Sequence, residues 1–415
     1  MKRFLSKKKT MTKLLVIAMI ISMTMISFAA CGRDIDESGA IGEKITVTDH
    51  ADREVTLPKD IERIAVCDIY PLPSVLAVFF DSADKIVGMP EPSMTAAKNG
   101  LLGQLYPEIL DAETGYIDGT NVNMEELAKL DPDVVFYSAS STELGDQLTE
   151  AGFNAVAISV NKWDYDCIET LNNWVDLLGQ MFPESDKSAI IRQKSQAIYD
   201  LVQERVKNID DANRRNVFFL FQYSDTTLLT SGKQFFGQWW ADAIGTNNVA
   251  TELTQDNSAP VNMEQVYAWD PDLIFITNFN TYYPDDLYNN TVEGYDWSPV
   301  NAVRNHEVYK MPLGMYRTYT PGADCPVTLL WMAKTAYPAQ FQDIDVIAEA
   351  KDSPTSRTSA LLFSILIYNT DRNELPIDGQ PIHTRLSKDN RFNVALGGYF
   401  LLHHKRTLVP NCFLC

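Results

Sequence analysis

One sixteen-residue pattern occurs twice in this chain. Residues 123–138 read NMEELAKLDPDVVFYS, and residues 262–277 read NMEQVYAWDPDLIFIT, with seven identical letters. An internal repeat can fix the architecture of a whole chain, because both copies must form the same local unit. The repeat therefore constrains the fold more than any other feature of the sequence.

Each copy predicts a helix, a turn and a strand. Asn123 and Asn262 can cap the helix, and Glu126 and Gln265 stand where a capping box requires them. The helix must end at Asp-Pro-Asp, because proline disfavours the helical conformation in the residue before it. The apolar runs VVFYS and LIFIT then predict buried parallel strands. We therefore expect two α/β lobes of like topology.

The segments around the repeat complete both lobes. Apolar spacing and turn residues predict a hairpin over 45–57, strands over 63–67, 85–89, 215–222 and 307–312, and helices over 71–80, 235–245 and 326–337. Between the lobes, residues 164–208 have helical periodicity interrupted at Pro183. A helix over 184–208 would span roughly 37 Å. It could cross from one lobe to the other, or it could be an ordinary surface helix.

The amino end has the parts of an export signal. Six basic residues precede the uncharged run LLVIAMIISMTMISF, which is short for a membrane span, although a membrane anchor is the alternative. Phe28-Ala29-Ala30-Cys31 resembles a bacterial lipobox, in which the cysteine is lipidated. We therefore expect an extracytoplasmic protein that Cys31 anchors to the cell membrane.

Composition and the pattern of predicted elements indicate where the domains begin and end and which partners are disfavoured. The expected units are a signal peptide (1–30), a tether (31–44), an N-terminal lobe (45–162), a linking helical segment (163–210), a C-terminal lobe (211–350) and an atypical tail (351–415). Residues 31–350 contain 21 Lys and Arg against 50 Asp and Glu, which argues against nucleic acid as a partner. The tail carries a net charge of +3 and no sustained periodicity, so we expect a shifted reading frame, foreign sequence or disorder there.

The order of these signals resembles the substrate-binding lipoproteins of ABC importers for iron-siderophore, haem and cobalamin, and most of all the iron-complex branch. The stretches that carry the resemblance are ITVTDHADREVTLPKDIERIAV, the two copies of the repeat, TSGKQFFGQWWADAIGTNNVA and VRNHEVYKMPLG. The resemblance implies a class III fold, in which a single long helix joins two Rossmann-like lobes and the ligand lies in the cleft between them. It also implies a monomer without a cofactor, which docks on a permease through Glu125 and Glu264. A helix dipole alone would also favour a carboxylate at these two positions.

Ligands of open α/β units bind beyond the carboxyl ends of the strands. From the residues expected there and nearby, the predicted ligand-binding set is Arg317, Tyr316, Tyr319, Tyr137, Tyr70, Tyr223, Trp239 and Asn278. Arg317 lies in an uncharged aromatic loop and could bind an anionic chelate in a bidentate manner. An internal ion pair with Asp324 is the alternative. Of the adjacent Trp239 and Trp240, we expect at least one in the core.

A ferric-siderophore-type chelate fits such a site best. A bare metal ion is disfavoured, because the two lobes contain only His50 and His306 and no metal-type cysteine spacing. Haem or cobalamin is the alternative ligand, since a Tyr or Met could hold haem iron. The chain has no GxSxG, HExxH or GxxxxGK[ST] motif, which argues against catalysis, so we expect a binding protein and not an enzyme. An exported enzyme or a ligand sensor is the alternative of another class.

Overall fold

The computed structural model describes residues 43–255 and 257–346. The expected signal peptide, Cys31, most of the tether and the expected tail lie outside these residues. A hairpin opens the described part, with β1 (Lys44–Thr48) antiparallel to β2 (Glu54–Pro58). Its turn is stabilised by the carboxylate of Asp49, which accepts hydrogen bonds from the amides of Ala51 and Arg53. This confirms the hairpin expected around HADR.

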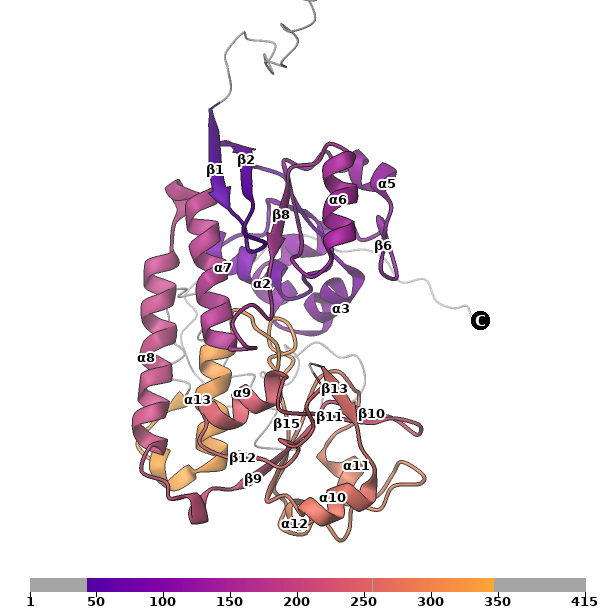
Figure 1. Cartoon of the computed structure of the whole chain (residues 1–415), viewed down its shortest axis with the longest axis vertical. Coiled ribbons are helices and arrows are strands. Elements are labelled where there is room, and N and C mark those ends of the chain that lie inside the picture. Colours follow the sequence, from indigo (N-terminus) through magenta and orange to yellow (C-terminus); the bar gives the residue numbers. More distant parts are fainter. Residues whose placement is uncertain (1–42, 256, 347–415) are drawn as a thin grey trace, which may run out of the picture. The chain divides into compact units, whose positions relative to one another are not determined.

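The N-terminal half contains a four-stranded parallel sheet of order β4-β3-β7-β8 (Figure 1). Its strands are β3 (Ile64–Val66), β4 (Ile86–Gly88), β7 (Val134–Ser138) and β8 (Ala155–Ile158). The other elements of this half are α2 (Leu72–Phe80), α3 (Glu91–Asn99), α4 (Leu102–Leu105), η1 (Pro107–Asp111), β5 (Ile117–Asp118), β6 (Asn121–Val122), α5 (Met124–Lys129) and α6 (Thr142–Glu150).

The C-terminal half repeats the arrangement as β12-β9-β14-β15, again parallel. Its strands are β9 (Asn216–Leu220), β12 (Asn247–Asn248), β14 (Leu273–Ile276) and β15 (Val308–Lys310). The other elements are η3 (Asp211–Asn213), α9 (Phe236–Ala243), α10 (Met263–Trp269), α11 (Pro284–Tyr288), α12 (Asn301–Arg304), α13 (Cys325–Ala336) and η4 (Pro338–Phe341). In both sheets the second strand of the chain lies outside the first, and the third and fourth follow on the other side, which confirms like topology.

One feature of this half was not predicted from the sequence. An antiparallel sheet of order β10-β11-β13 joins Gln222–Tyr223, Leu228–Ser231 and Ser258–Pro260. Strands of two to four residues are too short to show a clear alternation of apolar and polar side chains.

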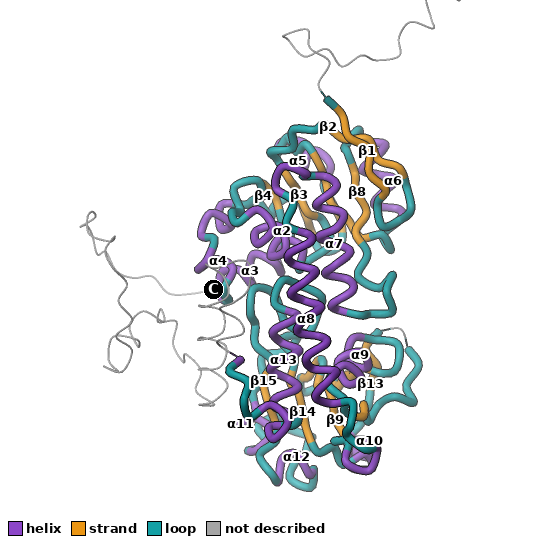
Figure 2. The backbone as a smooth tube through the Cα atoms, turned by 90° about the vertical axis from the view of Figure 1, so that its left-hand side faces the viewer, coloured by secondary structure: helices purple, strands orange, loops and turns teal. Residues whose placement is uncertain are grey.

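Helices α7 (Cys167–Met181) and α8 (Ser188–Val206), separated by η2 (Pro183–Ser185), connect the halves (Figures 1 and 2). In α8, Ser195 donates to Asn172 of α7, whereas Gln203 donates to the carbonyl of Ala243 in α9. Arg205 pairs with Asp343 beyond η4. Helix α8 therefore packs on α7 and on elements of the C-terminal half, and its 19 residues make it shorter than expected, at roughly 28 Å.

The repeat builds the amino ends of the strands in the same way twice. Helices α5 and α10 end just before Asp-Pro-Asp, and Asp131 and Asp270 take the left-handed conformation, at φ 46° and 40°. The second aspartate of each turn then accepts hydrogen bonds at the start of a neighbouring strand: Asp133 from the amides of Glu62 and Arg63, and Asp272 from that of Asn216.

Both asparagine caps form, but only one capping box is complete. Asn262 and Gln265 bond reciprocally. Asn123 accepts from the amides of Glu125 and Glu126, while the side chain of Glu126 instead pairs with Lys129 at 2.6 Å.

Side chains alternate between the two faces of each sheet, as in any strand. Val66 and Phe136 of one sheet and Phe219 and Phe275 of the other belong to a single buried cluster, which also contains Trp174 of α7. The opposite faces form separate clusters. One contains Cys67, Val135 and Tyr137, and the other contains Phe218, Ile274 and Trp297. Both sheets thus share one core with the connecting helices.

Candidate functional site

The order of each sheet defines where a ligand would bind. In both halves the order in which strands are added to the sheet reverses between the first and third strands. Open α/β sheets bind ligands at this point, beyond the carboxyl ends of the strands. In the N-terminal half, Asp68 and Tyr70 follow β3 and Ser138 closes β7. In the C-terminal half, Phe221 follows β9 and residues 277–280 follow β14.

The loop of residues 311–324 connects β15 to α13 and carries Arg317. Asn278 fixes the start of this loop by donating to the carbonyl of Met311 at 2.6 Å. Asp324 fixes its middle by accepting from the amide of Met315 at 2.8 Å. The loop also touches the N-terminal half, because the amide of Leu101 donates to the carbonyl of Gly314. The backbone that presents Arg317 is thus held from several sides.

Arg317 stacks on aromatic rings. Its guanidinium carbon lies 4.6 Å from the ring centre of Phe279 and 5.6 Å from that of Tyr316. The side chain is half-buried, and its backbone takes the left-handed conformation with φ 36°. Within residues 43–255 and 257–346, no carboxylate pairs with Arg317. The guanidinium therefore keeps its charge and its hydrogen-bond donors available to a ligand.

Asp324 does not form the ion pair that was the alternative for Arg317. Its carboxylate is fully buried and accepts from the amide of Met315. Burial raises the pKa of Asp324 to about 6, because no cation compensates the desolvation of its charge. Asp324 therefore supports the loop from inside.

Phe279 leads into a series of aromatic contacts. Its ring centre lies 4.7 Å from that of Phe221, which in turn lies 5.4 Å from that of Phe235. Phe235 contacts Tyr165, at 5.5 Å between ring centres. Lys310 holds the segment of Phe279 by donating to the carbonyls of Thr277 and Asn280. Phe279 directly follows the predicted ligand residue Asn278, whereas the sequence did not indicate the other three rings.

Four of the remaining predicted residues lie near Arg317 or support its loop. Tyr70 is 36% exposed, and Tyr316 is buried, which raises the pKa of its hydroxyl to about 12. Tyr319 is fully buried and contacts Phe221, so it packs beneath the loop. Asn278 holds the base of the loop, as described above.

The two tryptophans divide as expected. Trp240 is fully buried and donates to the carbonyl of Tyr319, whereas Trp239 is half-buried and hydrogen-bonds Asp166.

Two predicted ligand residues are not brought together with Arg317. Tyr137 is 2% exposed and packs in the cluster of Cys67, on the sheet face opposite the shared core. Tyr223 accepts a hydrogen bond from the indole of Trp297 and packs against Tyr282. Alternation along β7 places Tyr137 on the outer face of its sheet. Tyr223 lies in the short strand β10 and packs in the cluster of Phe218 and Trp297, away from the shared core.

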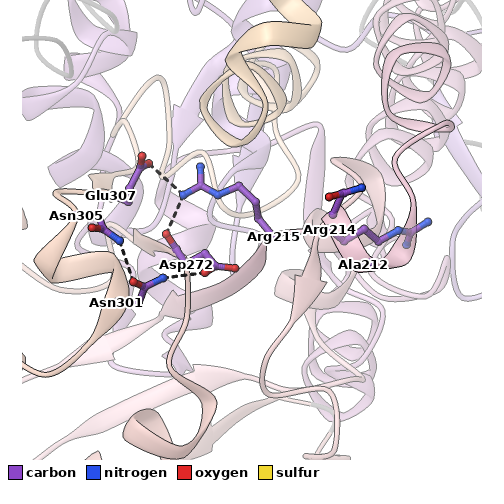
Figure 3. Close-up of a pocket in the computed structure, with 8 residues that line it drawn as sticks. Ala212, Arg214, Arg215, Asp272, Asn301, Asn305 and Glu307 are labelled. Carbon is purple, nitrogen blue, oxygen red and sulfur yellow. Dashed lines mark hydrogen bonds and ion pairs between the residues drawn. The ribbon is translucent and has the colours of Figure 1, made fainter.

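An open cavity of about 430 Å³ lies at the opposite, amino-terminal edge of the second sheet (Figure 3). Among its polar side chains, Arg215 pairs with Glu307 at 3.2 Å and Asn301 with Asp272 at 2.8 Å. Since those partners satisfy one another and the cavity is far from the carboxyl ends of the strands, we assign it a structural role.

Glu125 and Glu264 occupy the same place in the two copies. Each is exposed in the first turn of its helix, and neither forms an ion pair within the described part of the chain. The adjacent Glu126 is by contrast paired with Lys129.

Neither a metal centre nor a membrane helix is found in the residues that the structure describes. No cluster of three or more His, Cys, Asp or Glu side chains there could hold a metal ion. No helix among them combines the length and apolar character needed to span a bilayer. His50 accepts from the amide of Ser159, and burial lowers its pKa to about 4.

Comparison with known proteins identifies the family. The family described as periplasmic binding protein, Peripla_BP_2, matches residues 84–313, more than half of the chain. The chain belongs to the periplasmic binding protein family. Like its relatives in this family, it is a substrate-binding protein of an ABC transporter. Proteins of this class act outside the cytoplasm and work with the permease subunits of the transporter.

Two curated relatives and one solved structure show the extent of this likeness. The molybdate-binding protein MolA of Haemophilus influenzae is 26% identical over 74% of this chain and 88% of its own length. The uncharacterized ABC transporter substrate-binding lipoprotein YvrC of Bacillus subtilis is 23% identical over 77% of this chain and 96% of its own. A periplasmic solute binding protein from Veillonella parvula, whose structure is solved, is 29% identical, with a TM-score of 0.69 over 79% of this chain and 96% of its own.

Proposed function

We propose that this binding protein captures an anionic metal chelate of the ferric-siderophore type and delivers it to an ABC permease. The observation that carries the proposal is the Arg317 guanidinium, half-buried on the ring of Phe279 and without a carboxylate partner among the described residues. A partly buried charge without a partner is costly, so the site is poised for an anion that supplies the missing charge. An arginine can meet carboxylate, catecholate or hydroxamate oxygens with two parallel hydrogen bonds.

The aromatic surroundings support a chelate. Phe279 and Tyr316 flank the guanidinium, and Tyr70 exposes its ring near Tyr316. Flat apolar surfaces of this kind suit the organic part of a large ligand, whereas a small oxyanion requires several convergent hydrogen-bond donors. The ferric ion would arrive already enclosed by its chelator, so this proposal requires no metal ligands from the protein.

A molybdate-like oxyanion is the second candidate. The relative MolA, 26% identical, is named for binding molybdate, and Arg317 would suit that anion as well. Haem and cobalamin are further outcomes of the same binding experiment. Titrations of the protein with ferric catecholate, ferric hydroxamate, haem, cobalamin and molybdate, followed by tryptophan fluorescence, distinguish them.

Arg317→Ala tests the carrying observation. Loss of one partner of a buried charge pair costs about 2–5 kcal/mol, so we expect the ferric chelate to bind roughly 30-fold to several thousand-fold more weakly. Arg205→Ala is the control, because Arg205 pairs with Asp343 on the surface, and we expect its affinity to stay within about threefold of the parent. Unchanged chelate affinity in Arg317→Ala would refute the proposed site.

Glu125 and Glu264 are proposed to dock on cationic groups of the permease. Both carboxylates are exposed and unpaired in the described residues, and the repeat presents them in the same local geometry. We expect the double variant Glu125→Ala/Glu264→Ala to lose chelate uptake by cells while the purified protein binds the chelate with unchanged affinity. Glu126→Ala is the matched control, because that neighbour already pairs with Lys129. Uptake at the parental rate in the double variant would remove the assignment.

We also propose that Cys31 carries the lipid anchor. The sequence Phe28-Ala29-Ala30-Cys31 supports this, since lipidation at that cysteine would hold the protein on the outer face of the membrane. Mass spectrometry of the mature amino terminus checks it, and an unmodified Cys31 would contradict the anchor.

A further inference from the structure

Two buried cysteines far apart in the sequence meet in the shared core. Cys167 is the first residue of α7 and Cys325 is the first residue of α13. Both are 0% exposed, and both belong to the cluster that the two sheets share. Burial raises the pKa of the Cys167 thiol, and the neighbouring thiol of Cys325 raises it further. In Figure 1, helix α13 lies alongside α8 and below α7, and it contacts both helices.

The sulfur of Cys325 is tied to the loop that carries Arg317. It accepts from the amide of Gly322 at 3.1 Å and contacts the carbonyl of Thr320 at 3.3 Å. The sulfur of Cys167 contacts the backbone carbonyl of Tyr165. The ring of Tyr165 belongs to the series of aromatic contacts that begins at Phe279. A covalent link between the two sulfurs would therefore fasten the Arg317 loop to the first turn of α7.

We propose that Cys167 and Cys325 form a reversible disulfide bond outside the cytoplasm. The family acts in extracytoplasmic compartments, which favour disulfides. Two thiols that neighbour one another in one buried cluster can reach the bonding distance of about 2 Å by side-chain rotation and a small approach. This inference goes beyond the proposed function and does not depend on the identity of the ligand.

The reaction is a thiol–disulfide exchange with an oxidised dithiol protein or a small disulfide as the oxidant. One of the two cysteines, as thiolate, attacks a sulfur of the oxidant's disulfide and forms a mixed disulfide, and one oxidant thiol leaves. The other cysteine then attacks the first, forming the Cys167–Cys325 bond and releasing the second oxidant thiol. The protein loses two electrons and two protons, and the oxidant gains them. Since both sulfurs are buried, exchange takes place as the exported chain folds or when the loop opens.

Cys67 is an internal control. It is buried in the cluster on the far face of the first sheet, and within the described residues it has no other cysteine beside it. The same oxidising conditions should therefore leave Cys67 as a free thiol.

Peptide mapping tests the bond directly. The mature protein is isolated after export, or oxidised with diamide during refolding, then unfolded, alkylated without reductant, digested and analysed by mass spectrometry. We expect a linked peptide pair containing Cys167 and Cys325 that reductant separates, together with alkylated Cys67. Alkylated Cys167 and Cys325 after both treatments, or linkage of either one to Cys67, would overturn the proposal.

Thermal unfolding with and without dithiothreitol gives a second readout. A cross-link that closes a long loop should raise Tm by about 5–10 °C in a chain of this size. We expect reductant to abolish that increment in the parent and in Cys67→Ser, and to have no effect on Cys167→Ser or Cys325→Ser. Equal Tm values for the parent in both conditions would contradict the bond.

Discussion

The two halves of this protein share a frame, made of the helix caps and Asp-Pro-Asp turns of the repeat, at the amino-terminal edge of their sheets. They differ in the side chains that they present at the carboxyl-terminal edge. At the amino ends of the strands, Asp133 and Asp272 hold neighbouring strands in the same way. At the carboxyl ends the likeness stops. Asp68 of the first half is satisfied by the amide of Ser138 and the hydroxyl of Ser141, at 2.6 and 2.5 Å. The second half instead presents aromatic rings and Arg317, which has no carboxylate partner among the described residues.

This difference separates the residues that fold the repeat from those that serve the ligand. The helix caps and Asp-Pro-Asp turns satisfy backbone groups that every copy must satisfy. The carboxyl ends of the strands have no such backbone groups that a particular side chain must satisfy. Each half can therefore hold a different set of side chains there. The second half accordingly supplies most of the candidate ligand contacts, and the first half adds Tyr70.

The largest expected effect concerns the glycine that shapes the Arg317 loop. Gly314 has φ 59°, and a Cβ atom there would lie 2.0 Å from Oδ2 of Asp324. We expect Gly314→Ala to lower the free energy of unfolding by about 3–5 kcal/mol, because strain and displacement of Asp324 combine. In the first half, Gly119 has a similar φ of 61°, but a Cβ atom there would meet open space. We therefore expect Gly119→Ala to lower the free energy of unfolding by only about 1 kcal/mol. Urea denaturation measures both, and equal losses would show that the loop is not tightly held.

Buried carboxylates give the next contrast between the halves. Burial raises the pKa of Asp324 to about 6, above the value near 4 of an unfolded aspartate. The native state therefore binds the extra proton between pH 4 and 6, and the stability this contributes below pH 4 is lost as the pH rises through 6. We expect Asp324→Asn to be about 1–3 kcal/mol more stable than the parent at pH 7 and no more stable at pH 4.

Asp49 is the control for that experiment. It is 2% exposed in the first half but pairs with Arg53 at 2.6 Å. Asp49→Asn should therefore be less stable than the parent at pH 7, since it leaves the guanidinium without its partner. Thermal unfolding from pH 4 to 8 compares the two variants. A parallel pH dependence in Asp324→Asn and the parent would show that Asp324 is not the titrating group.

The shared frame predicts matched effects. Asp133→Ala leaves the amides of Glu62 and Arg63 without their acceptor, and Asp272→Ala does the same to Asn216. We expect each change to cost about 1–2 kcal/mol of unfolding free energy and neither to alter ligand affinity. Denaturation and binding titrations on the same samples check this. A loss of ligand affinity in either variant would contradict the conclusion that the amino-terminal edges of the sheets serve the fold and not the ligand.

The smallest effect is expected at the helix caps. Asn262 belongs to a complete capping box, whereas Asn123 caps alone because Glu126 pairs with Lys129. Asn262→Ala should therefore cost slightly more than Asn123→Ala, within a range of about 0.5–2 kcal/mol. Chemical denaturation of the two variants measures the order, and the reverse order would indicate that the box adds nothing here.

The sequence predicted the frame better than it predicted the site. The repeat carries its own stop and start signals, so strands β7 and β14 and the ends of α5 and α10 were confirmed within about a residue. The faces of the strands were harder, because continuous apolar runs hide the alternation that places Tyr137 on the outer face.

The ring contacts of Arg317 depend on tertiary packing. Tyr165 and Phe235 lie 70 residues apart in the chain and meet only in the fold. No local pattern signals such a contact, which is why the sequence indicated Arg317 but not the rings that lead away from its site.

The cluster shared by both sheets has a consequence for how the protein unfolds. Since Phe136 and Phe275 of the two sheets belong to the same buried cluster as Trp174 of α7, neither half can lose its inner face without exposing the other. The described part of the chain should therefore unfold in one calorimetric transition, and amides in β3 and β9 should exchange their hydrogens at similar rates. A ligand that touches mainly the second half would then slow hydrogen exchange in the first.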